Sequence, residues 1–541
     1  MIELPTTECY PIAVAPGLSR LFLDFCAGAE PARSFYASAP TGDGWRQAPA
    51  PAAHRAELVR LLAAQNPAPA AAAGLAALAG GAGAVLTGQQ VGLFGGQLLT
   101  PLKAATAIAR ARQATAAGHP HVGLFWLATE DHDFAEIDHV VFPAGRELAR
   151  LKYAPEQPPA TAQPVGSIQI DGSIGALLDR AWKILGDSFA MDALSDSYKP
   201  GRTFAQAFAD FYAQVFAAQG LLVVDAAGRD FHRLGAPVLR AAIERADEFH
   251  TALVERNHHL LAEGYHAQVA VAAQSSLLFL VDAKSGARLA LKRQPPTAAE
   301  PAGLWQAGRQ LYSTANLLGI LEAEPERISP SALLRPVFQD FLFSTSLIIG
   351  GPAEVAYFAQ SAVLYERILG RQTQPAPRFS ATLVEPSIAE LLRRHELSPE
   401  RLFSTTPDEL AQLLAARDLP IEGKRRIATA GNTLDGDLAA LLGWMQSLDE
   451  GLGRSAQTAA SKMRYQMNRL RRLAANFELQ REASLGRHAQ ALCQSLFPEG
   501  ALQERVHGAA YYFARYGFEL AETLCRQAEV DSKPGHTAIW L

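Results

Sequence analysis

Cysteine is scarce in this sequence. Its 541 residues include only Cys9, Cys26, Cys493 and Cys525. These thiols form no CxxC pair and have no nearby histidine at zinc-finger spacing, so they provide no disulfide framework. We therefore expect a protein of a reducing compartment, the cytoplasm, that is stabilised by its core rather than by cross-links.

The sequence also lacks the features that would indicate nucleic acid or a membrane as a partner. The net charge is -5, so no excess of positive charge attracts polyanions. The N-terminus has no basic stretch followed by an apolar segment, so we expect no secretory signal. Residues 68–86 are apolar but consist mainly of alanine and glycine, which argues against a membrane span.

What the sequence does contain is an alternation of apolar strands, glycine turns and helices. Residues 84–86 predict a buried strand, and a helix follows in which Thr100 could cap and Pro101 could take the first position. Residues 121–133 predict a second strand that runs into a charged turn, so the three elements form a βαβ unit. Further apolar strands at 221–226 and 347–350 extend this pattern to a Rossmann-like, doubly wound parallel α/β core.

The chain is too long for one core, so we expect two or three domains. Residues 1–240 predict the first part of the Rossmann-like core, and residues 329–380 its second part. Between them, 241–328 predict an inserted α+β subdomain, with a strand at 265–271 and a hairpin that turns at Gly286. Residues 381–541 predict a helical region with a coiled-coil arm at about 434–478.

Two apolar stripes support that arm. Their members are spaced three and four residues apart: Leu438, Leu441, Met445, Leu448 and Leu452, then Met463, Met467, Leu470, Ala474 and Phe477. This spacing predicts a long helical hairpin or coiled coil, with a stutter between the stripes. The alternative is an ordinary helical domain whose core is the stripe. Nearby, Ser387 with Glu390 and Thr406 with Glu409 are candidate capping boxes.

The first candidate site is the glycine-rich segment TGQQVGLFGG at 87–96. Backbone N–H groups of such a turn, next to a helix N-terminus, can bind an anion. Lys103, one turn inside the helix, could reach back toward a phosphate or carboxylate. The alternative is a merely tight turn. The candidate binding residues are Thr87, Gly88, Gln89, Gln90, Gly95 and Gly96, with Gly92 as a further point of close approach.

The second candidate site is the charged turn TEDHD, where the strand predicted within 121–133 ends. In open α/β sheets ligands bind at this edge. His132 could act as a general acid or base, while carboxylates could orient an amine or a ribose, or hold Mg²⁺. Zinc bound by His132 with His139, or a solvated turn with no ligand, are the alternatives. The candidates are Glu130, Asp131, His132 and Asp133.

The third candidate site spans residues 329–360. Polar groups within an apolar stretch need partners, so Arg335, Gln339 and Asp340 are expected to contact a ligand or one another. Gly351 ends the next strand, and Glu354 falls in the first turn of the following helix. Glu354 could contact a ligand or simply stabilise the helix N-terminus.

Together these segments resemble the BshC family, the cysteine-adding enzymes of bacillithiol biosynthesis. The resemblance rests on TGQQVGLFGG…LLTPLKAATAIA, FWLATEDHDFAEIDHV and LLRPVFQD…GGPAEVAYFAQ, and on KMRYQMNRL and ALQERVHGAAYYFARYGFEL near the C-terminus. It implies a Rossmann-like core related to nucleotidyl-transferring ligases, and a coiled-coil arm used in homodimerisation. It also implies the last step of the pathway, in which L-cysteine is joined through its carboxyl group to the amine of glucosaminyl-malate.

Amide formation from a carboxylate requires activation, most simply by ATP or another nucleotide through an acyl-adenylate or an acyl phosphate, with Mg²⁺ as an optional companion. Lys103 and Arg335 would offset developing charge. Two rival functions fit the same loop: a nucleotidyltransferase acting on a sugar or sugar acid, and a non-catalytic nucleotide-binding scaffold. No cysteine falls within the motifs, which disfavours a thioester on the protein.

Overall fold

The computed structural model describes residues 5–37, 43–47, 53–145, 147–295, 303–530 and 533–541. Residue contacts divide the chain into two compact units. Unit 1 comprises residues 1–144, 149–382 and 504–539, and unit 2 comprises 145–148, 383–503 and 540–541. Within unit 1, the buried face of α22 (Glu519–Val530) packs on α5 (Leu99–Ala116).

Unit 1 contains the expected Rossmann-like sheet. Its five strands run in the order β13-β12-β2-β3-β6, and every neighbouring pair is parallel. The predicted βαβ unit is confirmed as β2, α5 and β3. Helix α5 begins at Leu99, so Thr100 lies inside it rather than capping it. The strands are β2 (Gly83–Gln89), β3 (His121–Leu127), β6 (Leu222–Asp225), β12 (Thr345–Gly350) and β13 (Gln374–Pro377).

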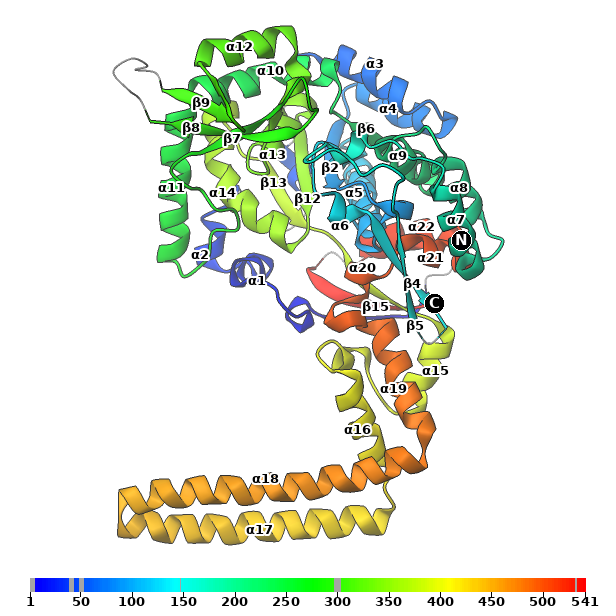
Figure 1. The fold of residues 1–541 in the computed structure, drawn as a ribbon, viewed down its shortest axis with the longest axis vertical. Helices are drawn as coiled ribbons and strands as arrows, with labels where there is room; N and C mark the ends of the chain where they lie inside the picture. The colour runs from blue at the N-terminus through cyan, green and yellow to red at the C-terminus, as the bar shows by residue number, and fades with distance from the viewer. Residues whose placement is uncertain (1–4, 38–42, 48–52, 146, 296–302, 531–532) are drawn as a thin grey trace. The chain divides into compact units, whose positions relative to one another are not determined.

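Helices pack around the strands of this sheet in unit 1 (Figure 1). Alternate residues of a strand point to opposite faces of its sheet. Val85 packs with Ala107 and Ala111 of α5. Its neighbour Leu86 and Trp126 of β3 belong instead to a large apolar cluster with the helices of the other layer. Those helices include α3 (Arg55–Gln65), α10 (Arg229–Glu244), α13 (Arg335–Phe343) and α14 (Pro352–Leu369). The sheet is therefore buried on both faces, and ligands can reach it only at its edges.

The insertion is an α+β element, as predicted. Its sheet has the order β10-β9-β8-β7-β11 with antiparallel neighbours. Helices α11 (Ala246–Ala262) and α12 (Thr314–Ala323) accompany it. Gly286, with φ of 70°, lies in the turn between β7 and β8. The strands are β7 (Ser275–Val281), β8 (Arg288–Gln294), β9 (Leu304–Ala307), β10 (Gln310–Tyr312) and β11 (Ile328–Pro330).

The strand predicted at 265–271 is absent from the described structure of that segment. The backbone of Val269 is satisfied by a side chain instead of a neighbouring strand. Its N–H donates to Gln360 Oε1 and its carbonyl accepts from Gln360 Nε2, both at 2.9 Å. The Gln360 side chain therefore makes the hydrogen bonds that a neighbouring strand would make to Val269 in a β-ladder.

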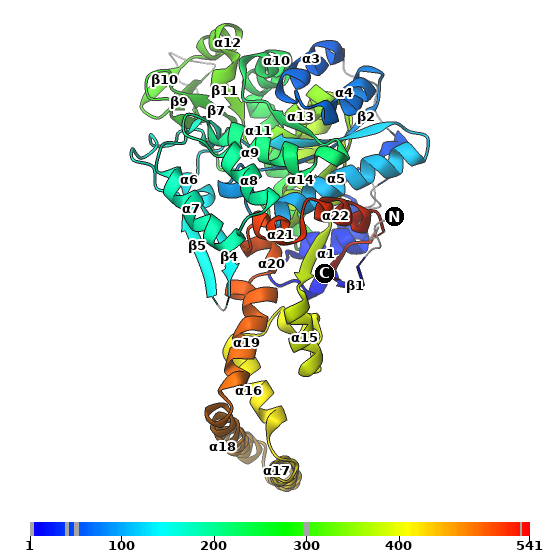
Figure 2. The same cartoon turned by 90° about the vertical axis from the view of Figure 1, so that its right-hand side faces the viewer.

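Unit 2 is helical. Its described helices are α15 (Pro386–Arg394), α16 (Pro407–Asp418), α17 (Ile421–Leu448), α18 (Glu450–Arg481) and α19 (Ala483–Leu496). The capping box of Thr406 with Glu409 is confirmed at the start of α16. Ser387 is not a cap, because Pro386 already occupies the first position of α15. The predicted helical hairpin is α17 and α18, which run side by side and are seen nearly end-on in Figure 2.

The apolar stripes do not form the core of that hairpin. Leu441 and Leu448 of α17, and Met463, Leu470 and Phe477 of α18, are between 49% and 62% exposed. The buried positions are mostly small residues such as Gly431, Ala460 and Ala475. The two helices therefore approach through small residues and leave most of the large apolar side chains outward.

Three further helices follow near the C-terminus. These are α20 (Gln503–Val506), α21 (Ala509–Tyr516) and α22. The final strand β15 (Gly535–Trp540) pairs antiparallel with β1 (Thr7–Pro11). Among the helices of the described residues, we find none that is both long and apolar enough to cross a bilayer.

Candidate active site

A cavity of about 480 Å³ opens at the carboxyl ends of β2, β3 and β12 in unit 1. This is the edge of a parallel sheet at which ligands usually bind. The predicted site residues that line it are Gly88, Gln89, Gln90, Lys103, Asp131, Arg335, Gln339, Gly351 and Glu354. Segments that lie far apart in the sequence thus meet around one space, as the strand pattern suggested.

Strand register brings the first two segments together. Gly88 and Gln89 pair with Trp126 and Leu127, and the N–H of Ala128 donates to the carbonyl of Gln89 at 2.9 Å. The Gln90 side chain then donates to Asp131 Oδ2 at 2.7 Å. The glycine-rich loop and the acidic turn are therefore parts of the same wall.

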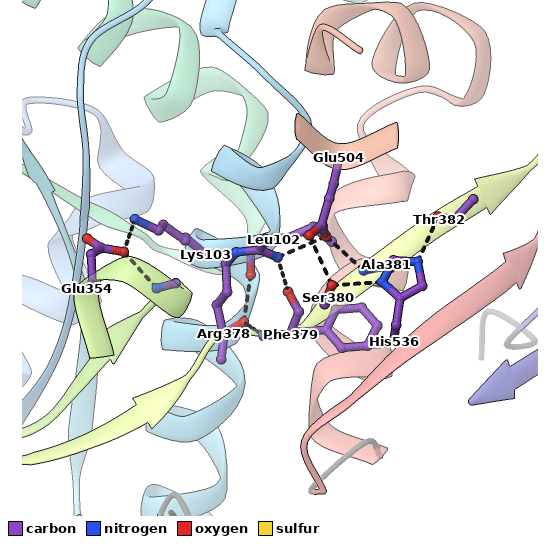
Figure 3. A network of polar contacts seen from close by, with 12 residues as sticks. Leu102, Lys103, Glu354, Arg378, Phe379, Ser380, Ala381, Thr382, Glu504 and His536 are labelled. Atoms are coloured by element: carbon purple, nitrogen blue, oxygen red, sulfur yellow. Dashed lines mark hydrogen bonds and ion pairs between the residues drawn. The ribbon is translucent and has the colours of Figure 1, made fainter. Parts of the chain in front are cut away.

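Lys103 reaches back from α5 to the end of β2, as predicted. Its ammonium group lies 2.8 Å from the Gly88 carbonyl, 2.9 Å from Gln89 Oε1 and 2.5 Å from Glu354 Oε2. The side chain is only 5% exposed. Burial lowers the pKa of the Lys103 ammonium, and Glu354 opposes that shift. Lys103 thus ties two segments of the cavity wall together through three acceptors, of which Figure 3 shows Glu354.

Glu354 serves both of the roles considered for it. Its Oε2 accepts from the N–H of Gly351 at 2.7 Å, which closes the N-terminus of α14, and the same oxygen contacts Lys103. Gly350, the last residue of β12, leaves room for this arrangement. A Cβ atom there would lie 2.9 Å from the Phe358 ring and 3.0 Å from Glu354 Cβ.

Arg335 begins α13 and points its charge at the cavity. Within the described structure its guanidinium has no carboxylate within ion-pair distance, and Tyr357 of α14 lines the same cavity. Burial works against its charge, but Tyr357, Asp131 and Glu354 raise its pKa. Burial and Glu354 also raise the pKa of the Tyr357 phenol. The Gln339 side chain, one turn further along, also lines the cavity.

The acidic turn divides between two environments. Asp131 lines the cavity, and although burial opposes its charge, hydrogen bonds from Gln90 and the His132 N–H lower its pKa. Glu130 turns away and lies 2.9 Å from His232 Nε2 on α10. Burial disfavours both charges of this pair, yet their attraction lowers the pKa of Glu130 and raises the pKa of His232. Glu130 is therefore a buried ion-pair partner and does not contact the cavity.

His132 and Asp133 do not line the cavity either. His132 Nδ1 lies 3.4 Å from an Arg288 nitrogen of the inserted sheet, and its ring is near Phe279. Asp133 is exposed just before a short helix. Within the part of the chain that the structure describes, no group of three His, Cys, Asp or Glu side chains is arranged to hold a metal ion. The described residues therefore provide no set of ligands for the zinc ion considered at His132 and His139.

Two other predicted residues have structural partners. Thr87 donates to the Ile349 carbonyl at 3.2 Å between β2 and β12. Asp340 is fully buried and accepts from Thr345, Thr373 and Arg371. Protein groups therefore satisfy the side chains of Thr87 and Asp340.

Gly95 and Gly96 are not an anion cradle. The N–H of Gly95 donates to Tyr198 Oη at 2.9 Å, and its carbonyl accepts from Tyr212 Oη at 2.7 Å. Gly95 has φ of 81°, and a Cβ there would lie 2.4 Å from the Phe211 ring. The carbonyl of Gly96 accepts from the Ala509 N–H at 2.9 Å. These glycines permit close packing of protein against protein.

Four further polar residues line the cavity and were not among the predicted site residues: Glu136, Tyr357, Arg378 and Arg505. Two carried a signal. Tyr357 lies three residues after Glu354 and so shares its helix face, and Arg378 follows the parallel strand β13. Arg505 had none, because its helix reaches the cavity only through contacts between distant segments.

Two family models match the chain. Residues 6–373 match the N-terminal Rossmann-like domain of the bacillithiol biosynthesis protein BshC, and residues 381–539 match its C-terminal coiled-coil domain. The chain belongs to the BshC family. Among BshC relatives, the protein of Koribacter versatilis (strain Ellin345) is 40% identical over 96% of this chain and 97% of its own.

The BshC relative of Solibacter usitatus (strain Ellin6076) is 34% identical over 95% of this chain and 96% of its own. Both relatives are named "Putative cysteine ligase BshC". The two family models extend over the helices of unit 2 and over all cavity residues of unit 1 except Arg378. The resemblance inferred from the motifs is thereby confirmed for the family.

Proposed function

We propose that this BshC family member is a ligase that joins L-cysteine, through its carboxyl group, to the amine of glucosaminyl-malate in the last step of bacillithiol biosynthesis. One observation carries the proposal. A single cavity holds carboxylates, Asp131 and Glu136, together with an arginine, Arg335, that lacks a carboxylate partner in the described structure. Such a cavity suits reactants that bear both ammonium and anionic groups.

The residues divide the work by charge. Asp131 and Glu136 both accept from Gln90, at 2.7 and 3.1 Å, which fixes them as a pair able to bind an ammonium or sugar hydroxyl group. Because its pKa is lowered, Asp131 stays ionised at neutral pH and can hold a cation. Gln339 and Gln89 offer neutral donors and acceptors to a hydroxyl-rich sugar.

The amide forms when the amine nitrogen attacks the cysteine carboxyl carbon, an oxygen leaves that carbon with its activating group, and the nitrogen loses a proton. ATP or another nucleotide, when bound, would supply the activation. A cavity of about 480 Å³ has room for such a reactant, and Arg335 has the charge to hold its phosphates. Mg²⁺ would arrive on those phosphates, since Mg²⁺ is usually held by few carboxylates plus substrate oxygens.

We also propose a homodimer that acts in the cytoplasm. The hairpin of α17 and α18 exposes large apolar side chains, among them Trp444 at 59% and Leu473 at 55%. A second copy would remove such surface from water. The solution mass at micromolar concentration tests this. A monomeric mass would rule out the hairpin as a dimer contact, whereas a dimer that dissociates on Trp444→Asp would support it.

The activity test uses purified protein with L-cysteine, glucosaminyl-malate, ATP and Mg²⁺, followed by mass spectrometry for the amide. Omitting each component in turn identifies the activating nucleotide. Amide product supports the ligase. Cleavage of a nucleoside triphosphate with transfer to a sugar, without amide, would instead establish a nucleotidyltransferase. Nucleotide binding without turnover would establish a scaffold.

A further inference from the structure

The second half of the glycine-rich loop serves as a docking platform for the C-terminal segment of unit 1. The N–H of Leu98 donates to the His507 carbonyl at 2.8 Å, and the N–H of Ala509 donates to the Gly96 carbonyl at 2.9 Å. From the other side, the N–H of Gly508 donates to the Val141 carbonyl at 2.7 Å. Residues 507–509 are thus held by backbone bonds from two directions.

This docking requires very close approach. A Cβ on Gly508 would lie 2.4 Å from Val140 Cγ2 and 2.5 Å from the Phe142 ring. Glycine is therefore the only residue that fits without movement of its neighbours. The close fit fixes the position of the preceding residues, Glu504 and Arg505, relative to the end of β2.

Glu504 adds a second attachment (Figure 3). Its carboxylate is almost fully buried and forms a bidentate ion pair with Arg378. The same two oxygens accept from Ser380 Oγ and from the Ala381 N–H, each at 3.0 Å. Burial opposes its charge, but Arg378 lowers the pKa of Glu504. Each oxygen thus accepts two hydrogen bonds, so Glu504 has no acceptor left for a direct hydrogen bond from its neighbour Arg505.

Arg505 lines the cavity and has no carboxylate partner among the residues that the structure describes. Arg505 keeps an exposed face; partial burial and the nearby charge of Arg378 lower its pKa, and Glu504 opposes that shift. The contrast with the other cavity cations is informative. Lys103 is paired with Glu354 and Arg378 with Glu504, whereas Arg505, like Arg335, has no carboxylate within ion-pair distance in the described structure.

We propose that Arg505 is an anion-binding residue of the reactant site, and that Glu504 and Gly508 are the positioning residues that deliver it. This inference rests on the function proposed above, which supplies two sources of the anion. One is the pair of malate carboxylates on the sugar conjugate, and the other is the phosphates of the nucleotide. Both match a guanidinium group, which donates two parallel hydrogen bonds to carboxylate or phosphate.

The test measures binding of each reactant alone, by calorimetric titration with glucosaminyl-malate, ATP with Mg²⁺, and L-cysteine. The proteins are the wild type, Arg505→Ala, Arg505→Lys, and Arg309→Ala as a control. Arg309 is an exposed arginine in the turn between β9 and β10 and does not line the cavity. The unfolding midpoint of each variant verifies that it folds.

We expect Arg505→Ala to weaken the binding affinity for one anionic reactant by about 10- to 100-fold. The affinity for cysteine should stay within about twofold of the wild type. Arg505→Lys should retain part of the affinity, and Arg309→Ala all of it. A lower affinity for glucosaminyl-malate would show that Arg505 binds the malate carboxylates. A lower affinity for ATP would show that it binds the phosphates. Affinities for both within about twofold of the wild type in Arg505→Ala would overturn the proposal.

The outcome separates this inference from the proposed function. If binding depends on Arg505 but the wild type forms no amide, the ligase assignment fails and the anion site stands. If the wild type forms amide while Arg505→Ala retains wild-type KM values for every reactant, the ligase assignment stands and the anion site fails.

Discussion

The two halves of the glycine-rich segment make an informative comparison. Gly88, Gln89 and Gln90 line the cavity and contact Lys103 and Asp131. Gly95 and Gly96, only a few residues later, are covered by tyrosines and by the C-terminal segment. The first half borders the cavity. The second half is packed against other parts of the protein.

The difference teaches that a glycine motif identifies a point of close contact and not the identity of the contacting group. It also separates two classes of substitution. Changes in the cavity half should act mainly on activity, and changes in the docking half mainly on stability.

The largest effect is expected at Lys103, which supports the cavity half. Lys103→Met removes the cation that Glu354, Gly88 and Gln89 share, so kcat/KM should fall by about 100-fold or more. Steady-state kinetics measure this. Glu354→Gln keeps the side-chain shape and should also lower kcat/KM. It provides the test if Lys103→Met proves unstable.

The control for Lys103 is Lys152→Met, because Lys152 forms an ion pair with Asp138 at 3.1 Å but is 64% exposed. Lys152→Met should keep wild-type activity. Values of kcat/KM within threefold of the wild type in both cavity variants would remove the Lys103–Glu354 pair from the site.

The next effect is expected in the docking half. Gly95→Ala places a Cβ atom 2.4 Å from Phe211 at φ of 81°. The free energy of unfolding should therefore fall by about 2–4 kcal/mol. Urea titration measures this, with Gly175→Ala as control, since a Cβ at Gly175 meets nothing within 4 Å. Equal stability of Gly95→Ala and the wild type would contradict the docking role.

Docking of the C-terminal segment should also weaken in acid. Glu522 on α22 accepts from Arg112 of α5 at 3.0 and 3.1 Å. Burial acts in the opposite direction, but hydrogen bonds from Arg112, Gln219 and Arg526 lower the pKa of Glu522 to about 2. Since the folded-state pKa is depressed, this stabilisation is present above the unfolded pKa near 4.5 and is lost as pH falls toward 2.

We expect the pH-dependent loss to be about 2 kcal/mol, and Glu522→Gln to flatten the decline in unfolding free energy between about pH 5 and pH 2. Glu450→Gln, at a side chain that is 88% exposed, is the control. An unchanged slope in Glu522→Gln would show that the contact between α5 and α22 does not depend on this carboxylate.

A smaller effect is expected at Gln90, in the cavity half. Gln90→Ala removes the donor shared by Asp131 and Glu136, so the KM of the amine-bearing reactant should rise by about 5- to 10-fold. The unfolding free energy should stay within about 0.5 kcal/mol of the wild type. Gln113→Ala, at the far end of α5, is the matched control. A loss of stability in Gln90→Ala without a change in KM would mean that Gln90 supports the fold and not reactant binding.

The smallest effect is expected at His132, since it lies outside the cavity beside Arg288. His132→Ala should lower kcat/KM by less than about threefold, well below the effect of Asp131→Asn. Equal losses in the two variants would mean that the histidine, and not only its neighbour, takes part in the reaction.

Much of the candidate site could be predicted from the sequence because strand ends are local features. Gly88, Asp131 and Gly351 follow apolar strands, and parallel strands place their carboxyl ends at one edge. Glu130 shows the limit of this reasoning. Its position beside Asp131 is visible in the sequence, but its partner His232 belongs to a helix about a hundred residues later.

The sequence by itself determined the βαβ unit, the capped helix at Thr406, the helical hairpin and the family, because periodicity and backbone preferences act over a few residues. Only the tertiary structure decided which charges are neutralised. Arg378 and Glu504 are 126 residues apart, and their pairing leaves Arg505 without a counterion in the described structure. Electrostatic energy depends on distance in space and on burial, and neither quantity is written in the order of the residues.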